Sequence, residues 1–211
     1  MARSMPLKAE ALDEAARLIE GGGILAMPTE SSYGLGASPW QAAAIDRLYR
    51  IKGRDERSPI LVLIAGPAHL PELVAEVPPA AATLMQAFWP GPLTLIFRAA
   101  SRVPANLTAG TGTIGIRFPA LPQLTDLLTR TGPLTGTSAN RSGAVPARTA
   151  AEVQAALGAE VDLILDGGAA GGAVPSTIVD TTGPPRLIRE GPIARAQIAH
   201  ALAGSNLDLA L

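Results

Sequence analysis

Short aliphatic runs alternate with amphipathic helical patterns along most of this chain, and Gly or Pro closes nearly every run. Between residues 8 and 20, apolar residues recur at i, i+3, i+4 and i+7, the spacing of one helix face. Three glycines at 21–23 end that helix, and a short strand is predicted over 24–27. Strands and helices that alternate in this way predict an α/β fold.

The same alternation continues to the end of the chain. Ser38 and Pro39 form a good N-cap and first-turn pair for a second helix, and Thr149 is predicted to cap a later one. A turn at 182–185 predicts that the last two strands pair as a hairpin. Helices are expected at 38–51, 80–88, 121–131, 150–157 and from about 193 to 203, and strands at 60–65, 93–97, 113–118, 134–137, 161–165, 177–179 and 186–188.

This order of segments predicts a single α/β domain built on a mixed, twisted sheet. The chain has 211 residues, which is enough for one good core. Apolar residues make up 47% and aromatic residues only 3%, as expected for an aliphatic α/β core. We expect one domain over 1–211, with its core at about 11–193, a flexible Gly/Ala loop at 167–173 and a frayed tail at 204–211.

Composition excludes several classes of protein. No apolar run approaches the roughly 20 residues of a membrane-spanning helix, and the N-terminus carries acids early, without the apolar region of a secretory signal. Zero cysteines exclude disulfides, Cys-ligated zinc and thiol catalysis. His69 and His200 are far apart, and no carboxylate cluster suggests a metal site built by the protein. The net charge of −1 lacks the basic excess of proteins that hold long nucleic acids.

The segment 26–63 carries the densest chemistry. Small hydroxyls and a tyrosine precede one predicted helix, and cations follow it: Thr29, Ser31, Ser32, Tyr33, then Lys52, Arg54 and Arg57. Hydroxyls, backbone amides and a fork of cations are what a polyphosphate and a small zwitterion require of a protein. Taken alone, the cations also fit a solvated helix C-terminus, where they favour the dipole.

Three later segments have the same ambiguity. IGIRFP at 114–119 is a strand in which Arg117 lies on the face opposite the apolar residues, usually a surface position. SAN with a following Ser-Gly, within 136–143, is also a common turn composition. The last candidate segments are STIVD at 176–180 and REG at 189–191. No GxxxxGK[ST] motif occurs, so a P-loop is excluded.

In this order, PTE-x-x-YGLG at 28–36, KGR at 52–54, IGIRFP, SAN and STIVD resemble the YrdC/TsaC-like threonylcarbamoyl-AMP synthases. The resemblance covers about 11–193. It implies a YrdC-like twisted sheet of parallel and antiparallel strands, flanked by helices, with a concave active-site groove. It also implies a nucleotidyltransferase that joins L-threonine, bicarbonate or CO₂ and ATP into threonylcarbamoyl-AMP, releasing pyrophosphate, for threonylcarbamoyl adenosine in tRNA. Some relatives carry a further C-terminal domain, which we expect to be absent here.

Carried over position by position, the resemblance assigns catalytic roles to Lys52 and Arg54. It implies ATP binding by Lys52, Arg54, Ser58, Thr113, Ser138, Asn140, Pro146 and Arg189. It implies L-threonine binding by Thr29, Tyr33, Leu63, Arg117, Gly136 and Ser176. The sequence departs from the family pattern at Asp55, where proline is more usual, at Leu63, where some relatives have histidine, and at Pro175, where glutamate is usual.

The implied reaction needs Mg²⁺ bound mainly through phosphate oxygens, with no metal ligand from protein side chains and no organic cofactor. A cytoplasmic enzyme is expected, which passes its product to a tRNA threonylcarbamoyl transferase complex and has little need to bind tRNA itself. Two rivals stay open. One is a non-catalytic relative that binds double-stranded RNA. The other is the carbamoyl-phosphate domain of hydrogenase maturation, which normally sits in longer chains with zinc-finger and acylphosphatase segments.

Overall fold

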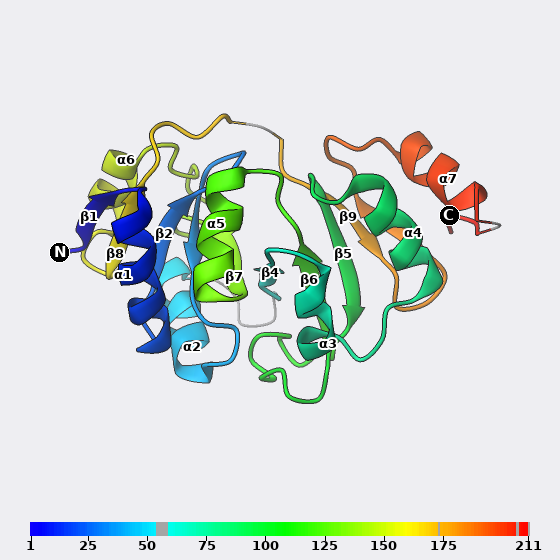
Figure 1. The fold of residues 1–211 in the computed structure, drawn as a ribbon, viewed down its shortest axis with the longest axis horizontal. Coiled ribbons are helices and arrows are strands. Elements are labelled where there is room, and N and C mark those ends of the chain that lie inside the picture. The colour runs from blue at the N-terminus through cyan, green and yellow to red at the C-terminus, as the bar shows by residue number, and fades with distance from the viewer. Residues whose placement is uncertain (54–58, 173, 206, 211) are drawn as a thin grey trace.

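The computed structural model describes residues 1–53, 59–172, 174–205 and 207–210, and places their strands in one ten-stranded sheet (Figure 1). The strands are β1 (Arg3–Pro6), β2 (Leu25–Pro28), β3 (Tyr33–Gly36), β4 (Leu61–Leu63), β5 (Leu93–Arg98), β6 (Thr113–Arg117), β7 (Leu134–Ser138), β8 (Leu163–Asp166), β9 (Thr177–Asp180) and β10 (Arg186–Arg189). Their spatial order is β1-β8-β2-β3-β7-β4-β6-β5-β9-β10. Both parallel and antiparallel pairs occur along it, so the predicted mixed sheet is confirmed.

Helices cover both faces of this sheet. They are α1 (Ala9–Glu20), α2 (Ala42–Lys52), α3 (Leu70–Leu73), α4 (Pro79–Phe88), α5 (Pro122–Thr131), α6 (Ala150–Leu157) and α7 (Arg195–Ala203). Helices α1 and α5 pack side by side over one face of the N-terminal half, whereas α4 and α7 pack together beside β5 and β9 (Figure 1). The long connection from β8 to β9 crosses from one half of the sheet to the other.

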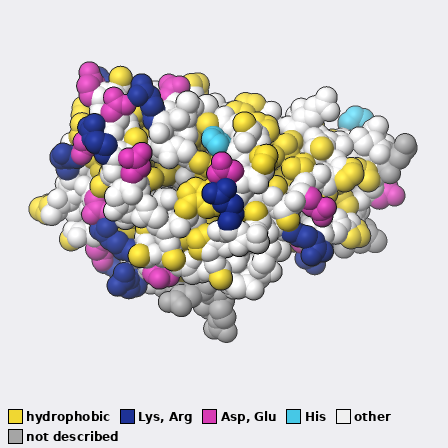
Figure 2. Space-filling model, turned by 60° about the horizontal axis from the view of Figure 1, so that its bottom comes forward, with side chains coloured by type: hydrophobic (Ala, Val, Ile, Leu, Met, Phe, Trp, Pro, Cys, Tyr) yellow, Lys and Arg dark blue, Asp and Glu magenta, His cyan; other side chains and the backbone are white. Residues whose placement is uncertain are grey.

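The face of the molecule drawn in Figure 2 mixes charges of both signs. Figure 2 shows Lys and Arg side chains interspersed with Asp and Glu, with apolar side chains between them, and no broad area of a single charge on the face drawn. Among the helices that the structure describes, none has the length and apolarity needed to cross a bilayer.

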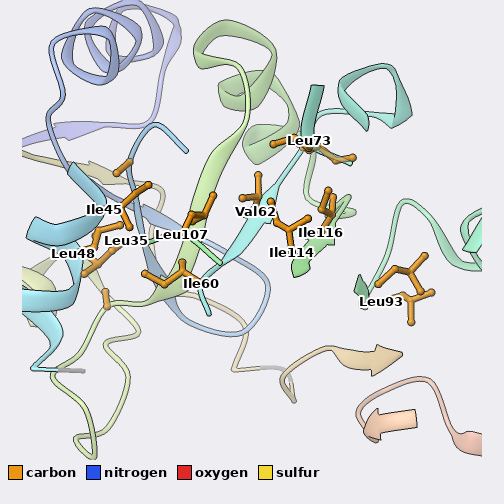
Figure 3. Packing of buried hydrophobic residues seen from close by; sticks show 14 of the residues in the cluster. Leu35, Ile45, Leu48, Ile60, Val62, Leu73, Leu93, Leu107, Ile114 and Ile116 are labelled. Atoms are coloured by element: carbon orange, nitrogen blue, oxygen red, sulfur yellow. The ribbon is translucent and has the colours of Figure 1, made fainter. Parts of the chain in front are cut away.

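Buried aliphatic side chains form two clusters, one on each side of the sheet. The larger contains side chains of α2, α4, α6 and α7 with alternate residues of most strands, among them Leu35, Ile45, Val62 and Ile116 (Figure 3). The smaller joins α1 and α5 to the opposite face of β2, β7 and β8. Because alternate strand residues enter opposite clusters, each register is strongly specified.

Some predicted boundaries are wrong for local reasons. Ser38 and Pro39 do not begin α2; the helix starts at Ala42 with Gln41 as N-cap, and the Ser38 hydroxyl instead accepts from the Trp40 amide at 3.3 Å. The strand predicted at 60–65 is reduced to β4. Strands β1 and β3 and helix α3 carry no strong periodic signal and were not predicted.

The described residues of the C-terminal segment make contacts with the rest of the chain. Leu207 and Leu209 pack against the larger cluster. The Ala210 amide donates to the Pro185 carbonyl at 2.7 Å, and Arg186 and Ala210 form an isolated parallel bridge. These contacts hold the tail against the β9–β10 hairpin, whose predicted antiparallel pairing is confirmed.

Thr149 caps α6 as predicted, and this cap supports a test of stability. Its hydroxyl accepts from the Glu152 amide at 3.2 Å, while the Glu152 carboxylate accepts from the Arg148 amide at 2.6 Å. Thr149→Ala should lower the free energy of unfolding by about 1 kcal/mol, because the amide loses its acceptor. Denaturant titration would measure the change.

The matched control is Thr129→Ala on the exposed face of α5, where the hydroxyl only donates to the Thr125 carbonyl one turn earlier. That change should stay within about 0.5 kcal/mol of wild type. Equal losses in the two variants would mean that the Thr149 cap contributes nothing specific.

Candidate active site

One face of the central strands forms the floor of a cavity of about 690 Å³. Residues paired in register share a face of the sheet. A single row therefore crosses β4, β6, β5, β9 and β10 along Leu63, Arg117, Thr94, Ile178 and Arg189, and every member of the row lines the cavity. The walls come from three loops, which contribute Thr29, Ser31 and Ser32, then Val145, Pro146 and Arg148, and then Gly172, Pro175 and Ser176.

Small residues keep the floor open. A Cβ atom built at Gly136 would lie 2.8 Å from both Leu61 Cδ1 and Leu63 Cγ, closer than real Cβ atoms approach. A Cβ at Gly115 would lie 3.4 Å from Thr94 Cγ2. Gly136 is therefore required where β7 passes β4, and its missing side chain leaves room above the floor.

Arg117 lies in this floor, where sequence reasoning alone favoured a surface position. The residue is 9% exposed. Its Nε donates to the Gly91 carbonyl at 3.1 Å, and its Nη2 donates to Glu30 Oε1 at 2.8 Å. Burial lowers the pKa of Arg117, the Glu30 carboxylate opposes that shift, and the charge of Arg189 adds to it. The guanidinium nevertheless stays protonated, because arginine begins from a very high value.

Arg189 provides a second guanidinium at the same end of the cavity. Its Nε and Nη2 donate to the Ser176 carbonyl at 3.1 and 2.8 Å. The hydroxyls of Ser176 and Thr94 share a hydrogen bond of 2.8 Å, and both residues are buried. Burial lowers the pKa of Arg189 as well. One buried and one exposed guanidinium beside two buried hydroxyls make this end of the cavity suited to an anion.

Thr29 and Tyr33 also line the cavity, but their hydroxyls make different contacts. The Thr29 hydroxyl donates to the Ser32 carbonyl at 2.7 Å, which closes the 29–32 loop. The Tyr33 ring is fully buried, and its hydroxyl donates to the Gly168 carbonyl at 2.8 Å and accepts from the Gly167 amide at 3.2 Å. Burial raises the pKa of this phenol. Tyr33 therefore anchors the β8–β9 connection at the edge of the cavity.

Lys52 lies beneath the loop that follows β7. It is 3% exposed, and its Nζ donates to the carbonyls of Ser138 and Asn140 at 2.6 and 2.9 Å. Ser138 lines the main cavity, whereas Asn140 lines an adjoining cavity of about 430 Å³; Pro146 lines both. In this arrangement the Lys52 ammonium orders the loop from below.

The cavity thus brings together most of the residues that the sequence singled out. Those lining it are Thr29, Tyr33, Leu63, Thr113, Arg117, Gly136, Ser138, Pro146, Ser176 and Arg189. Lys52 and Asn140 lie next to it. Arg54 and Ser58 lie outside the described residues, as do Asp55 and Arg57.

Among the residues of this site that sequence reasoning missed are Thr94, Arg148 and Glu30. Thr94 gave no signal beyond its place in a predicted strand, but in register with Arg117 it enters the floor. Arg148 lines both cavities, and its guanidinium donates to the Ala170 carbonyl at 3.3 Å. Glu30 is part of the PTE segment, yet nothing in the sequence pairs it with Arg117, 87 residues away.

Metal ligands were also sought in the part of the chain that the structure describes. No group of three or more His, Asp or Glu side chains there could hold an ion. The described cavity is lined by cations, hydroxyls and aliphatic groups. Its cations can neutralise negative charge, so the cavity suits anionic ligands.

Comparison with known proteins adds to this geometry. The Sua5/YciO/YrdC family model, described as "Telomere recombination", matches residues 17–191. A threonylcarbamoyl-AMP synthase of Thiobacillus denitrificans is 40% identical over 160 residues, covering 75% of this chain and 85% of that protein. The Bacillus subtilis enzyme of the same name is 36% identical over 201 residues, or 94% of this chain and 58% of its own. The crystal structure of Pyrococcus abyssi Sua5 complexed with L-threonine superposes with a TM-score of 0.88 at 32% identity, over 100% of this chain and 62% of that one.

Proposed function

This chain belongs to the Sua5/YciO/YrdC family, and we propose on that premise that it is a threonylcarbamoyl-AMP synthase. The reaction joins L-threonine, bicarbonate or CO₂ and ATP, and it releases pyrophosphate. The observation that carries the proposal is the row from Leu63 to Arg189, which places two guanidiniums and a pair of hydrogen-bonded hydroxyls in one cavity. Such a site can hold two anions side by side, as this chemistry requires.

Threonine is proposed to bind at the Arg117 end. A guanidinium holds a carboxylate through two parallel hydrogen bonds. Thr29, Ser176 and the backbone of Gly136 then surround the amino-acid side chain, and Leu63 and Tyr33 limit the size of the pocket. The relative solved with L-threonine supports an amino acid as the ligand of this fold.

ATP is proposed to bind along the neighbouring wall. Thr113, Ser138 and Arg189 line the main cavity, and Asn140 and Pro146 continue it into the adjoining one. Arg54 and Ser58 are proposed nucleotide contacts from the sequence alone. Lys52 would contribute by holding the Ser138 and Asn140 carbonyls from below, and so would fix the loop that meets the nucleotide.

The chemistry needs little acid–base catalysis from the protein. The threonine amine adds to CO₂ and loses a proton to form a carbamate; from bicarbonate, water is released in place of the proton. A carbamate oxygen then attacks the α-phosphorus of ATP, and the bond to the pyrophosphate oxygen breaks. The cavity aligns two anions that repel each other, and its cations stabilise charge that builds on the leaving group.

Mg²⁺ is proposed to enter with ATP. The cavity residues include no carboxylate among those described, so the ion would be held by phosphate oxygens and water. When bound, it would neutralise charge on the triphosphate. The product is proposed to pass to a tRNA threonylcarbamoyl transferase complex in the cytoplasm, where tRNA, ATP and threonine are available.

The alternative of a double-stranded RNA-binding protein is less well supported. Proteins that neutralise many phosphates carry a basic surface. This chain has 17 basic and 18 acidic residues, and the face in Figure 2 mixes both signs. Filter binding across a salt series should show no strong RNA binding that falls steeply with added salt.

Pyrophosphate release tests the proposed function kinetically. With the complete mixture, pyrophosphate should accumulate in step with loss of ATP. Omission of threonine, or removal of CO₂ and bicarbonate, should reduce release to background, because the attacking carbamate cannot form. Equal release without threonine would indicate simple ATP hydrolysis and contradict the proposal.

A further inference from the structure

Glu30 is the acidic side chain on which Arg117 depends, although it does not line the cavity. Its Oε1 accepts from Arg117 Nη2 at 2.8 Å and from the Ala120 amide at 3.0 Å. Its Oε2 is buried and has no hydrogen-bond partner among the described residues. An unsatisfied buried oxygen costs stability, which makes a purely structural purpose for this carboxylate a poor explanation.

The hydrogen bonds of Arg117 show which edge of its guanidinium is used by the protein. Nε and Nη2 form the side edge, and both already have acceptors, Gly91 O and Glu30 Oε1. Nη1 has no hydrogen-bond partner among the described residues, and Nη2 has a second hydrogen. The end edge, Nη1 with Nη2, is therefore the edge of Arg117 that is available to bind a carboxylate in the cavity.

We propose that Glu30 is a positioning residue for the amino acid, acting through Arg117: by holding the side edge, it aims the end edge of the guanidinium at the substrate carboxylate. This inference deepens the proposed function and rests on it. Glu30 and the Gly91 carbonyl are two acceptors on one edge, so they determine both the rotation of the guanidinium and its plane. With only Gly91 left, the long arginine side chain regains rotamer freedom.

The surrounding charges agree with a positioning role. Glu30 opposes the effect of burial on Arg117, while Arg189 increases it. The local balance is two guanidiniums and one carboxylate, so one positive charge is still available for a ligand anion. Glu30 thus holds Arg117 without cancelling the charge of the site.

Two variants of Glu30 separate the effect of its position from the effect of its charge. Glu30→Ala removes the acceptor, and the Kd and KM for threonine should rise about 10- to 100-fold, because misplacement of a binding group by about 1 Å has effects of this size. The KM for ATP should change little. Glu30→Gln keeps an oxygen at Oε1 without the charge, so threonine affinity should return to within about fivefold of wild type, the difference between a charged and a neutral hydrogen bond.

The control is Glu72→Ala on α3, which removes the same charge from an exposed ion pair that Glu72 forms with Arg102. It should leave both substrates unaffected. Calorimetry with threonine, initial rates with each substrate varied, and thermal unfolding would be measured on all variants. Wild-type protein that binds threonine but releases no pyrophosphate would contradict the proposed function and leave the calorimetric comparison of the Glu30 variants valid.

Three outcomes would overturn the positioning role. Threonine affinity that is unchanged or tighter in Glu30→Ala would mean that Glu30 competes with the ligand for Arg117. A Gln variant as weak as the Ala variant would mean that charge matters and position does not. Equal losses for ATP and threonine, with a lowered unfolding midpoint, would mean that Glu30 only supports the fold.

Discussion

Valine is expected to be used up to about 10⁴-fold less efficiently than threonine in kcat/KM, because a pocket that hydrogen-bonds a substrate hydroxyl leaves its own polar groups unpaired when that hydroxyl is missing. The groups concerned are the hydroxyls of Thr29 and Ser176 and the backbone at Gly136, which line one cavity. Ser176 is 4% exposed, so water compensates poorly for a lost partner. Competition between the two amino acids, with product adenylates separated by chromatography, would measure the ratio.

Serine provides the matched comparison. It keeps the hydroxyl and loses one methyl group, so it should be a poor but detectable substrate, disfavoured by roughly 10- to 200-fold. A ranking of valine above serine would show that the pocket selects shape alone. The assignment of Thr29 and Ser176 to the threonine side chain would then be wrong.

Arg117→Ala and Arg54→Ala are each expected to weaken the binding of a different substrate. Loss of one charged hydrogen-bonding partner costs about 1.5–3 kcal/mol, or roughly 10- to 150-fold in affinity. Arg117→Ala should therefore weaken threonine far more than ATP, since its guanidinium lies in the cavity floor. Arg54→Ala should weaken ATP far more than threonine, an expectation that comes from the KGR segment because the structure does not describe this residue. Calorimetry with each ligand would measure both constants.

Arg130→Ala is the control for these two variants. It removes an exposed arginine of α5 that pairs with Asp13, remote from the cavity-lining residues, and should change neither affinity. If Arg117→Ala and Arg54→Ala each weakened both ligands equally, the assignment of one arginine to each substrate would be wrong.

The fold can be predicted from this sequence where it depends on neighbouring residues, as at helix ends and turns. The glycines after α1, the Thr149 cap and the turn between β9 and β10 each act within a few residues, and each was predicted correctly. β1 was missed because it is a mostly exposed edge strand whose pairing partner, β8, comes about 160 residues later. β3 was missed because its YGLG sequence has two glycines, and its place between β2 and β7 is decided by those strands.

In the site, too, local features could be predicted and contacts between distant segments could not. Most of the site residues that the motifs identified line the cavity. The contacts between them depend on sheet register, which sequence alone does not reveal. Thr94 comes beside Arg117 through β5–β6 pairing, and Glu30 reaches the same guanidinium from the β2–β3 loop. The burial of Lys52 under the Ser138 carbonyl likewise depends on tertiary packing.

The most direct test of the account is identification of the reaction product. The purified protein would be incubated with ATP labelled in the adenosine, L-threonine, bicarbonate and Mg²⁺, and the nucleotides separated by chromatography with mass detection. The account predicts a new adenylate with the mass of threonylcarbamoyl-AMP, present only when threonine and bicarbonate are both supplied. Folded protein that binds ATP and threonine yet forms no such adenylate would contradict it.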